Sequence, residues 1–220
     1  MSATITKLTP TSLAALLCAK ICHDLISPVG ALGNAVEILD DEDNQDMYED
    51  AINLVRTSSR QASSKLKFLR IALGTAGSAP GVIPTSEVMK LTNDMFLDSK
   101  PELVWKVDSD GIDKNRARIV MNLVMLGVQA APRGGTVTIT RQGNGDSAEF
   151  TIVSDGPNVR LDAAVAKAIA GKMPEDGIDG RSIQSLYANL LARDIGGSVG
   201  ASDDESLITF TAKFPVASAT

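Results

Sequence analysis

Apolar residues recur at steps of three and four along two stretches near the start of the chain, residues 11–40 and 47–73. This spacing is typical of helices that carry one apolar face. The acidic, polar residues 40–46 between the two stretches suit a turn, with carboxylates near the start of the second helix. We therefore expect residues 1–75 to form a hairpin of two long antiparallel helices. The apolar face of the first helix consists of Ile21, Leu25, Val29, Leu32, Val36 and Leu39.

A single hairpin of this kind cannot bury the apolar faces of both helices. Packing against a second copy would cover them in a four-helix bundle with a symmetric interface. The sequence therefore predicts a homodimer. The second helix would contribute Ala51, Val55, Ala62, Leu66, Leu69 and Leu73.

The rest of the chain mixes helical and strand patterns. Residues 74–84 are rich in Gly, Ala, Ser and Pro without periodicity, which predicts a linker. The mixture that follows predicts an α+β domain over residues 85–220. Its expected strands are residues 102–107, 136–141, 149–153 and 207–214, and its expected helices are residues 86–97, 114–131, 161–170 and 182–195.

Composition narrows the function classes. The net charge of −6 and the pI near 4.8 argue against nucleic acid as a partner, because an acidic chain repels phosphate backbones. The chain has no uninterrupted apolar run of about 18 residues, so we expect no membrane span. No basic stretch followed by an apolar one opens the sequence, so we expect no secretory signal and a cytoplasmic location.

The two cysteines, Cys18 and Cys22, lie on the first expected helix, where a disulfide would close almost no loop. Together with His23 they would be the only soft metal ligands. We expect buried structural thiols rather than a metal or haem site.

His23 is the only histidine, and it falls in the first expected helix. At about 100° per residue, it points away from the apolar face. A solvated surface histidine with no role is the simplest alternative. The residues that share its side of the helix are Ala19, Lys20, Ser27, Gly30, Asn34 and Glu37.

Unfavourable helix residues beside His23 favour a functional surface instead. Pro28 removes a helical hydrogen bond, at about 3 kcal/mol. Gly30 and Gly33 each destabilise a helix interior by about 1 kcal/mol relative to alanine. Asp24 is adjacent and can hydrogen-bond locally. A sequence that tolerates these penalties indicates a bare surface that a partner approaches closely.

The second helix adds positive charge at the same level. If the turn centres near Asp43, His23 lies level with residues near Ser63, where basic side chains gather. They suit an anionic group or an acidic partner, although a solvated helix face explains them equally well. These residues are Arg56, Arg60, Lys65 and Lys67.

The segment HDLISPVGALGNAVEIL, residues 23–39, resembles the phospho-acceptor box of sensor histidine kinases. In that family an acidic residue follows the histidine, and a proline comes five residues after it; here these are Asp24 and Pro28. Ile26 stands where the family usually has a basic residue. The order of elements also resembles a kinase dimerisation hairpin followed by a Bergerat-type ATP-binding domain, and the resemblance implies that fold for residues 85–220.

The second half departs from the kinase motifs at three places. Asn122 matches the first asparagine of the kinase asparagine box, but Leu126 stands where a second asparagine would lie near magnesium. Residues 155–158 lack the second glycine of the first glycine box, and residues 182–186 contain no glycine where the next box would align. Without these groups a triphosphate and its magnesium lose their contacts. We therefore expect a degenerate domain that does not bind ATP.

This combination resembles the ChpT family of alphaproteobacterial histidine phosphotransferases. The resemblance implies a homodimer that takes a phosphoryl group from the receiver domain of a hybrid histidine kinase. It passes the group to response regulators, typically CtrA-like and CpdR-like, in cell-cycle control. His23 would be the phosphorylated nucleophile, and Asp24 would orient it. The family needs no cofactor of its own, because Mg²⁺ belongs to the partner receiver. Candidate residues for receiver docking are Lys20, Ser27, Gly30, Asn34 and Arg60.

Two alternatives stay open at this point. An authentic ATP-using sensor kinase with unusual motifs would bind Mg-ATP with measurable affinity. A non-catalytic dimeric adaptor would bind receivers even after His23→Ala, and no phosphoryl group would pass through it.

Overall fold

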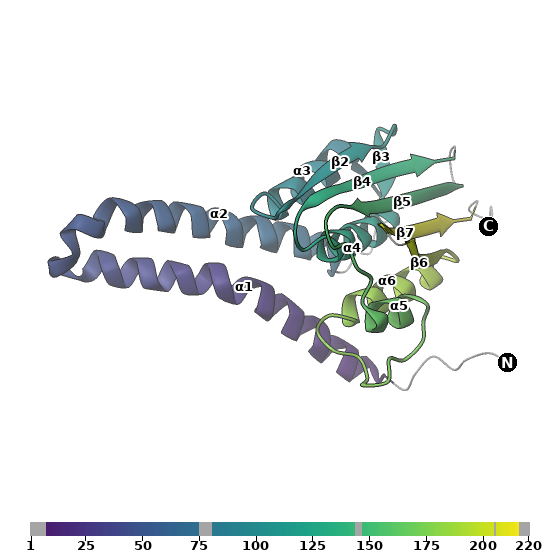
Figure 1. The fold of residues 1–220 in the computed structure, drawn as a ribbon, viewed down its shortest axis with the longest axis horizontal. Coiled ribbons are helices and arrows are strands. Elements are labelled where there is room, and N and C mark those ends of the chain that lie inside the picture. The colour runs from purple at the N-terminus through teal and green to yellow at the C-terminus, as the bar shows by residue number, and fades with distance from the viewer. Residues whose placement is uncertain (1–7, 75–80, 144–146, 205, 216–220) are drawn as a thin grey trace.

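A long hairpin of two helices projects from a mixed α/β domain (Figure 1). The computed structural model describes residues 8–74, 81–143, 147–204 and 206–215. The hairpin consists of α1 (Pro10–Asp40), the 3-10 helix η1 (Glu42–Met47) and α2 (Tyr48–Ala72). The antiparallel hairpin expected from the sequence is confirmed, and the bounds of both helices agree with the expected ones to within one residue.

Local sequence explains where the two helices begin. The hydroxyl of Thr9 accepts a hydrogen bond from the Ser12 amide at 3.1 Å, which caps α1. Pro10 occupies the first turn, where its missing N–H is not needed. Glu49 and Asp50 lie in the first turn of α2, where negative charge suits the helix dipole.

The α/β domain is built on a five-stranded mixed sheet in the order β2-β4-β5-β7-β6. β2 and β4 are parallel, and the other neighbours are antiparallel. The strands are β2 (Pro101–Lys106), β4 (Gly135–Gln142), β5 (Ala148–Asp155), β6 (Ser198–Asp204) and β7 (Leu207–Phe214). A separate antiparallel pair joins β1 (Val82–Pro84) to β3 (Gly111–Asp113).

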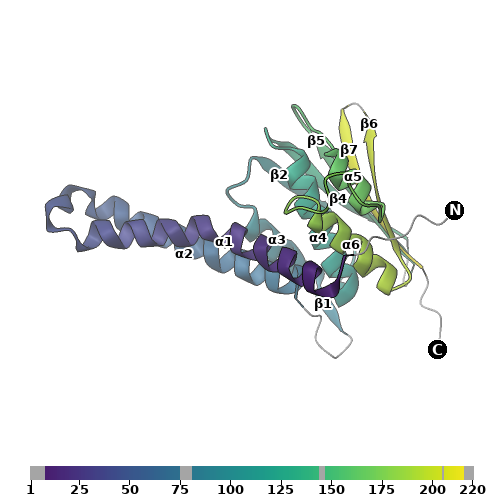
Figure 2. The ribbon, with the colours of Figure 1, turned by 90° about the horizontal axis from the view of Figure 1, so that it is seen from below.

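Helices α4, α5 and α6 cover one face of this sheet (Figures 1 and 2). Alternate residues of β4, β5 and β7 are buried against them, and the intervening residues are partly exposed. α4 is the centre of the core, because every residue from 119 to 127 is buried. The helices of this domain are α3 (Thr85–Met95), α4 (Lys114–Ala130), α5 (Ala163–Ile169) and α6 (Ile183–Asp194).

The expected α+β class and all of the expected helices and strands of this domain are confirmed. Three further strands were not expected. β1 and β3 are too short for a visible alternation, and β6 (SVGASDD) consists of small and acidic residues with low strand propensity. The linker prediction is wrong at its end, because residues 82–84 pair with β3. Residues 75–80 of that linker, and residues 1–7, lie outside the described residues.

The base of the hairpin belongs to the core of the α/β domain. Phe68 and Ala72 of α2 are fully buried there. The ring of Phe68 packs edge-on against Phe96, with 5.7 Å between centroids. The hydroxyl of Tyr187 on α6 donates to the carbonyl of Leu73 at 3.1 Å. These contacts fix the direction in which the hairpin leaves the domain, and therefore what α1 faces.

Candidate functional site

His23 lies on the outer side of α1, and its side chain is 84% exposed. The direction expected from helical geometry is therefore confirmed. Nδ1 of the ring lies 3.2 Å from Oδ1 of Asp24. When Nδ1 carries the proton and donates it to this carboxylate, Nε2 keeps a free lone pair. The arrangement leaves an accessible nucleophilic nitrogen.

Asp24 is itself held in place by Lys20. The Lys20 ammonium donates to both carboxylate oxygens, at 2.6 and 2.5 Å, and the two side chains are only 11% and 12% exposed. A pair of this kind, four residues apart on one face of the helix, is strengthened by its partial burial. Lys20 was expected to dock a receiver. In the structure its charge is neutralised by Asp24, and it holds the carboxylate that contacts His23.

Pro28 has a specific counterpart on α2. Proline lacks an N–H, so the carbonyl of Asp24, one turn earlier, loses its helical partner. Nζ of Lys65 donates to this carbonyl at 3.0 Å. α1 runs through the proline as one helix, and it bends partway along its length (Figure 1). The contact confirms that His23 lies level with the basic residues of α2, and it commits one of them to a structural bond.

The glycines that follow have no packing reason within the described chain. A Cβ on Gly30 or on Gly33 would find nothing within 4 Å. Alanine would favour the helix by about 1 kcal/mol at each position. Ser27 and Asn34 on the same stretch are also exposed. The surface beyond His23 is therefore bare, as the sequence predicts.

Two clefts flank His23 where α1 meets the α/β domain. One, of about 500 Å³, is lined by His23 and Lys20 on α1 and by Gln129 and Arg181 on the other side. The second, of about 420 Å³, lies beside the Lys20–Asp24 pair and includes Ser27. Three of the expected docking residues line neither cleft: Gly30, Asn34 and Arg60.

Gln129 and Arg181 were not among the residues expected from the sequence. Gln129 ends α4, and Arg181 precedes α6, so both are distant from His23 along the chain. No motif marks either residue. The loop between α5 and α6 passes beside the first half of α1 (Figure 1) and thereby brings Arg181 to the cleft. This placement is a property of the tertiary structure alone.

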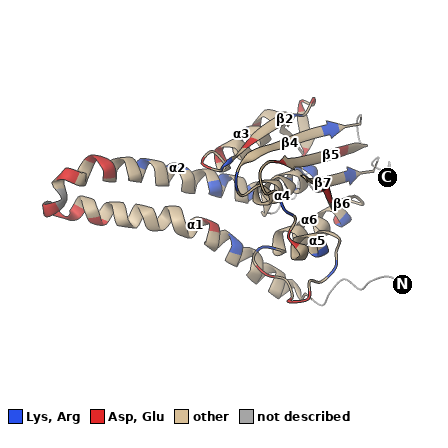
Figure 3. Cartoon of the chain, in the orientation of Figure 1, with Lys and Arg blue, Asp and Glu red and all other residues tan. Residues whose placement is uncertain are grey.

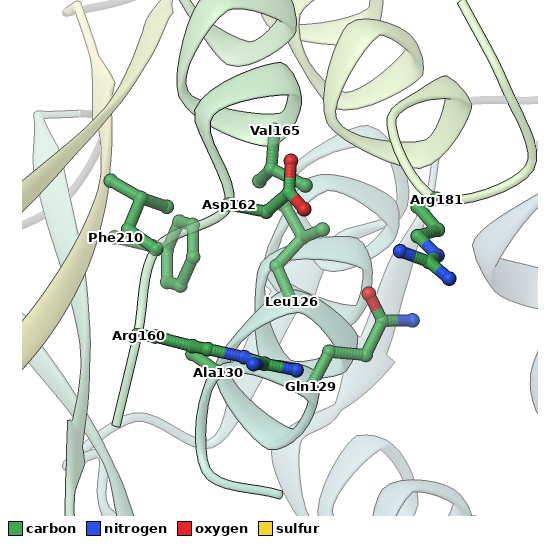
Figure 4. A pocket seen from close by; sticks show the side chains of 9 residues that line it. Leu126, Gln129, Ala130, Arg160, Asp162, Val165, Arg181 and Phe210 are labelled. Atoms are coloured by element: carbon green, nitrogen blue, oxygen red, sulfur yellow. The ribbon is translucent and has the colours of Figure 1, made fainter. Parts of the chain in front are cut away.

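A third cleft, of about 300 Å³, contains Leu126, the residue that stands where the kinase asparagine box has its second asparagine (Figure 4). It lies between α4, the segment after β5 and the start of α6. Leu126 stands in its wall with Val165 and Phe210, and Leu126 is 2% exposed. An aliphatic side chain therefore fills the position expected of a magnesium ligand. Arg160 and Arg181 line the same cleft.

Asn122, which matches the first kinase asparagine, has a structural role here. It is fully buried, and its Nδ2 donates to the carbonyls of Ala72 and Arg118, both at 2.8 Å. The first bond ties the end of α2 to α4. A side chain bound in this way is directed toward the base of the hairpin.

The glycines near residues 155–158 are required by the backbone. A Cβ on Gly156 would come within 2.3 Å of the Gly134 carbonyl oxygen. A Cβ on Gly135 would come within 2.0 Å of the Asp155 carbonyl oxygen, and the φ of Gly135 is 111°. Glycine lets the start of β4 and the end of β5 approach this closely. Phosphate binding is not needed to explain these residues.

The start of α6 is likewise satisfied by the protein itself. Oδ1 of Asp179 accepts from the amides of Arg181 and Ser182 and from the Ser182 hydroxyl, at 3.0, 2.8 and 2.7 Å. The Ser182 hydroxyl, helped by the two amides, holds the pKa of Asp179 below its usual range. A carboxylate of the chain itself therefore binds the two amides that immediately precede α6.

Cys18 and Cys22 are exposed free thiols, so the expectation of buried thiols is wrong. The reason is that no described residue of α1 before Pro28 is fully buried in a single chain. Among the described residues, no group of three His, Cys, Asp or Glu side chains could hold a metal ion.

Both the family model and a curated relative of this chain are histidine or protein phosphotransferases. Residues 85–206 match the family model of the histidine phosphotransferase C-terminal domain. The chain is 37% identical over 201 residues to protein phosphotransferase ChpT of Brucella abortus (strain 2308), covering 91% of this chain and 95% of that protein.

Solved structures agree in fold. A bacterial phosphotransferase solved at 1.7 Å has a TM-score of 0.83 and 33% identity, over 94% of this chain and 98% of the other. The nucleotide-free catalytic domain of the histidine kinase ThkA has a TM-score of 0.50 and 14% identity, over 63% of this chain and 96% of that domain. The second likeness concerns the fold alone.

The bond from Lys65 to the Asp24 carbonyl predicts that substitutions at Lys65 and Pro28 have non-additive effects on stability. Lys65→Met removes the donor, so we expect the free energy of unfolding to fall by about 1–3 kcal/mol. In a Pro28→Ala background the alanine N–H can donate to the Asp24 carbonyl in place of Lys65. Lys65→Met should then lower the free energy of unfolding by less than about half as much. Urea denaturation of the four proteins, at one fixed protein concentration, measures the coupling. Lys67→Met is the control, with equal effects in both backgrounds. Additive effects of Lys65→Met and Pro28→Ala would contradict the assignment.

Proposed function

Because the chain belongs to the histidine phosphotransferase family, we propose that it relays a phosphoryl group between receiver domains through His23. The observation that carries this proposal is the exposed imidazole, whose Nδ1 contacts a carboxylate that is itself fixed by Lys20. An exposed nucleophile suits a substrate that is a folded domain, because the attacking nitrogen must reach into the active site of the partner.

In the proposed first step, the lone pair of His23 Nε2 attacks the phosphorus of an aspartyl phosphate. A P–N bond forms while the P–O bond to the donor aspartate breaks, and the donor carboxylate leaves with the electron pair. Asp24 accepts the Nδ1–H bond and stabilises the positive ring. In the second step, a carboxylate of the acceptor receiver attacks the same phosphorus, and the imidazole leaves as the neutral base. Positioning is the main contribution of the protein.

The partners in this proposal are receiver domains. The donor is the receiver of a hybrid histidine kinase, and the acceptors are CtrA-like and CpdR-like response regulators that control the cell cycle in the cytoplasm. Mg²⁺ and a lysine come with each receiver. The histidine box in residues 23–39 and the likeness to a phosphotransferase named ChpT support this assignment.

ATP is not the phosphoryl source in this proposal. Three features support that part. Leu126 stands in the wall of the third cleft, Asn122 is bound to backbone carbonyls, and the two amides just before α6 are bound to Asp179. A kinase needs a magnesium ligand and groups that hold the phosphates at these places.

A homodimeric four-helix bundle is part of the same proposal. Within one chain α1 leaves Ile26, Val29 and Val36 exposed by 71%, 54% and 49%. The middle of α1 carries no charged residue, and acidic residues gather at the hairpin tip (Figure 3). By length and composition α1 could also cross a membrane. The charged α2 beside it favours a second hairpin over lipid as its cover.

The relay predicts transfer that depends on His23 alone. When the protein is mixed with a ³²P-labelled phosphorylated receiver without ATP, the wild type should take up label that is stable to base and labile to acid. His23→Ala should take up none, while Cys22→Ala, one residue away, should behave as the wild type. Label retained by His23→Ala, or none on the wild type, would refute the relay. Receiver binding that survives without any transfer would favour the adaptor.

The nucleotide part of the proposal has its own measurement. Titration calorimetry with Mg-ATP should give no heat of binding, because the metal ligand and the phosphate contacts are missing. A sensor kinase catalytic domain, titrated in parallel, is the positive control. A dissociation constant in the micromolar to millimolar range for this chain would favour an ATP-using kinase.

The proposed dimer can be tested by a substitution on the exposed apolar face of α1. Val36→Glu places a carboxylate in the proposed seam, where an unpaired charge is strongly disfavoured, so sedimentation should shift from dimer to monomer. Val82→Glu is the control, because Val82 is 67% exposed and lies on β1 beside the last turn of α2, not on α1. A wild type that sediments as a monomer would overturn the dimer.

A further inference from the structure

Two lysines of the hairpin beside His23, Lys20 and Lys65, already have hydrogen-bond partners. Lys20 is paired with Asp24, and Lys65 donates to the Asp24 carbonyl. Ile26 stands where sensor kinases usually carry a basic residue. A phosphoryl group at Nε2 brings about −1.5 to −2 of charge, and Lys20 and Lys65, which are committed to Asp24, leave most of it without a partner.

Arg181 lies across the cleft that contains His23. The two residues line the same space of about 500 Å³, together with Gln129. Arg181 is exposed, and its guanidinium points toward the amide of Gln129 (Figure 4). Because Gln129 lines the same cleft as His23, the guanidinium is directed toward that shared cleft. Guanidinium also offers a planar set of donors that fits phosphate oxygens.

The backbone at Arg181 is fixed rather than loose. The Asp179 carboxylate accepts from the Arg181 and Ser182 amides, and the Ile183 amide donates to the Asp179 carbonyl at 2.9 Å. The Asp179 amide donates to the Ser182 hydroxyl at 3.0 Å. This hydrogen-bonded turn positions the arginine before a partner arrives, which reduces the entropy that must be lost on contact.

The other charges that face the cleft do not replace Arg181. Lys20 lines it but is paired with Asp24. Asp179 lines it as well, and its carboxylate is hydrogen-bonded to Ser182 and to the Arg181 amide. The Asp179 carboxylate is thus fixed by its own turn, and the Arg181 side chain lines the cleft from that turn.

We propose that Arg181 contacts the phosphoryl group as it moves to and from His23 Nε2, and supplies the positive charge that α1 lacks. The proposal rests on the relay function above. Arg181 forms no covalent bond and transfers no proton; it donates N–H bonds to non-bridging phosphoryl oxygens, whose charge it neutralises during transfer.

Two phosphoryl donors separate this role from receiver docking. One is the phosphorylated receiver at saturating concentration, followed as a single turnover. The other is phosphoramidate, a small donor that has no docking surface. Because the proposed contact is with the phosphoryl group itself, Arg181→Ala should slow labelling of His23 from both donors by about 10- to 100-fold, the loss typical of one charge-assisted hydrogen bond. Arg181→Lys keeps the charge and should recover most of the rate.

Arg193→Ala is the matched control, because Arg193 is an exposed arginine in the last turn of α6. It should label at the wild-type rate from both donors. Thermal unfolding by circular dichroism checks that each variant is folded. If Arg181→Ala does not fold, the comparison of Arg181→Lys with Arg181→Gln carries the test.

Wild-type rates for Arg181→Ala with both donors would overturn the proposal and leave the relay intact. A loss with the receiver but not with phosphoramidate would also overturn it, because Arg181 would then bind the receiver surface and not the phosphoryl group. A wild type that takes no label from either donor, or label that persists in His23→Ala, would overturn the relay, and the role of Arg181 with it.

Discussion

The burial of the last turns of α2 in the core of the α/β domain is the constraint on which the site depends. Phe68 and Ala72 pack with α4, and the backbone of the next residue, Leu73, accepts from Tyr187 on α6. This anchorage sets the direction of the hairpin. Because α1 lies antiparallel to α2, its first half passes the loop that precedes α6. His23 therefore shares a cleft with residues of the α/β domain.

A second consequence concerns the residues that resemble kinase motifs. Asn122 holds the end of α2, and Gly135 and Gly156 allow two backbone segments to approach each other. The turn before α6 is held by hydrogen bonds to Asp179. Each motif position that remains therefore has a structural reason to exist in the absence of nucleotide. The kinase-like outline of the domain is therefore supported by contacts within the chain itself.

The charges around His23 show how a partly buried network can hold a histidine while leaving one of its ring nitrogens exposed. Asp24 accepts from Lys20, and its backbone carbonyl accepts from Lys65, so this residue is fixed at both its side chain and its main chain. The imidazole contacts the fixed carboxylate through one nitrogen and presents the other to solvent. Orientation comes from the partly buried pair, and reactivity toward a second protein comes from exposure.

The sequence by itself determined the hairpin, the α+β domain and the outward direction of His23, because helical and strand periodicities are local and each fixes its own face. It also located Asp24 and Pro28, which lie within one or two turns of the histidine. The sequence did not predict the three-residue strands β1 and β3 or the acidic edge strand β6. These strands form through backbone pairing, which leaves no alternation of apolar residues in the sequence. Only the tertiary structure decided three features. These are the bond from Lys65 to the Asp24 carbonyl, the hydrogen bonds of Asn122 and the approach of Arg181 to His23. Each depends on how segments far apart in the chain are packed, and that packing follows from the shared core and not from any local pattern.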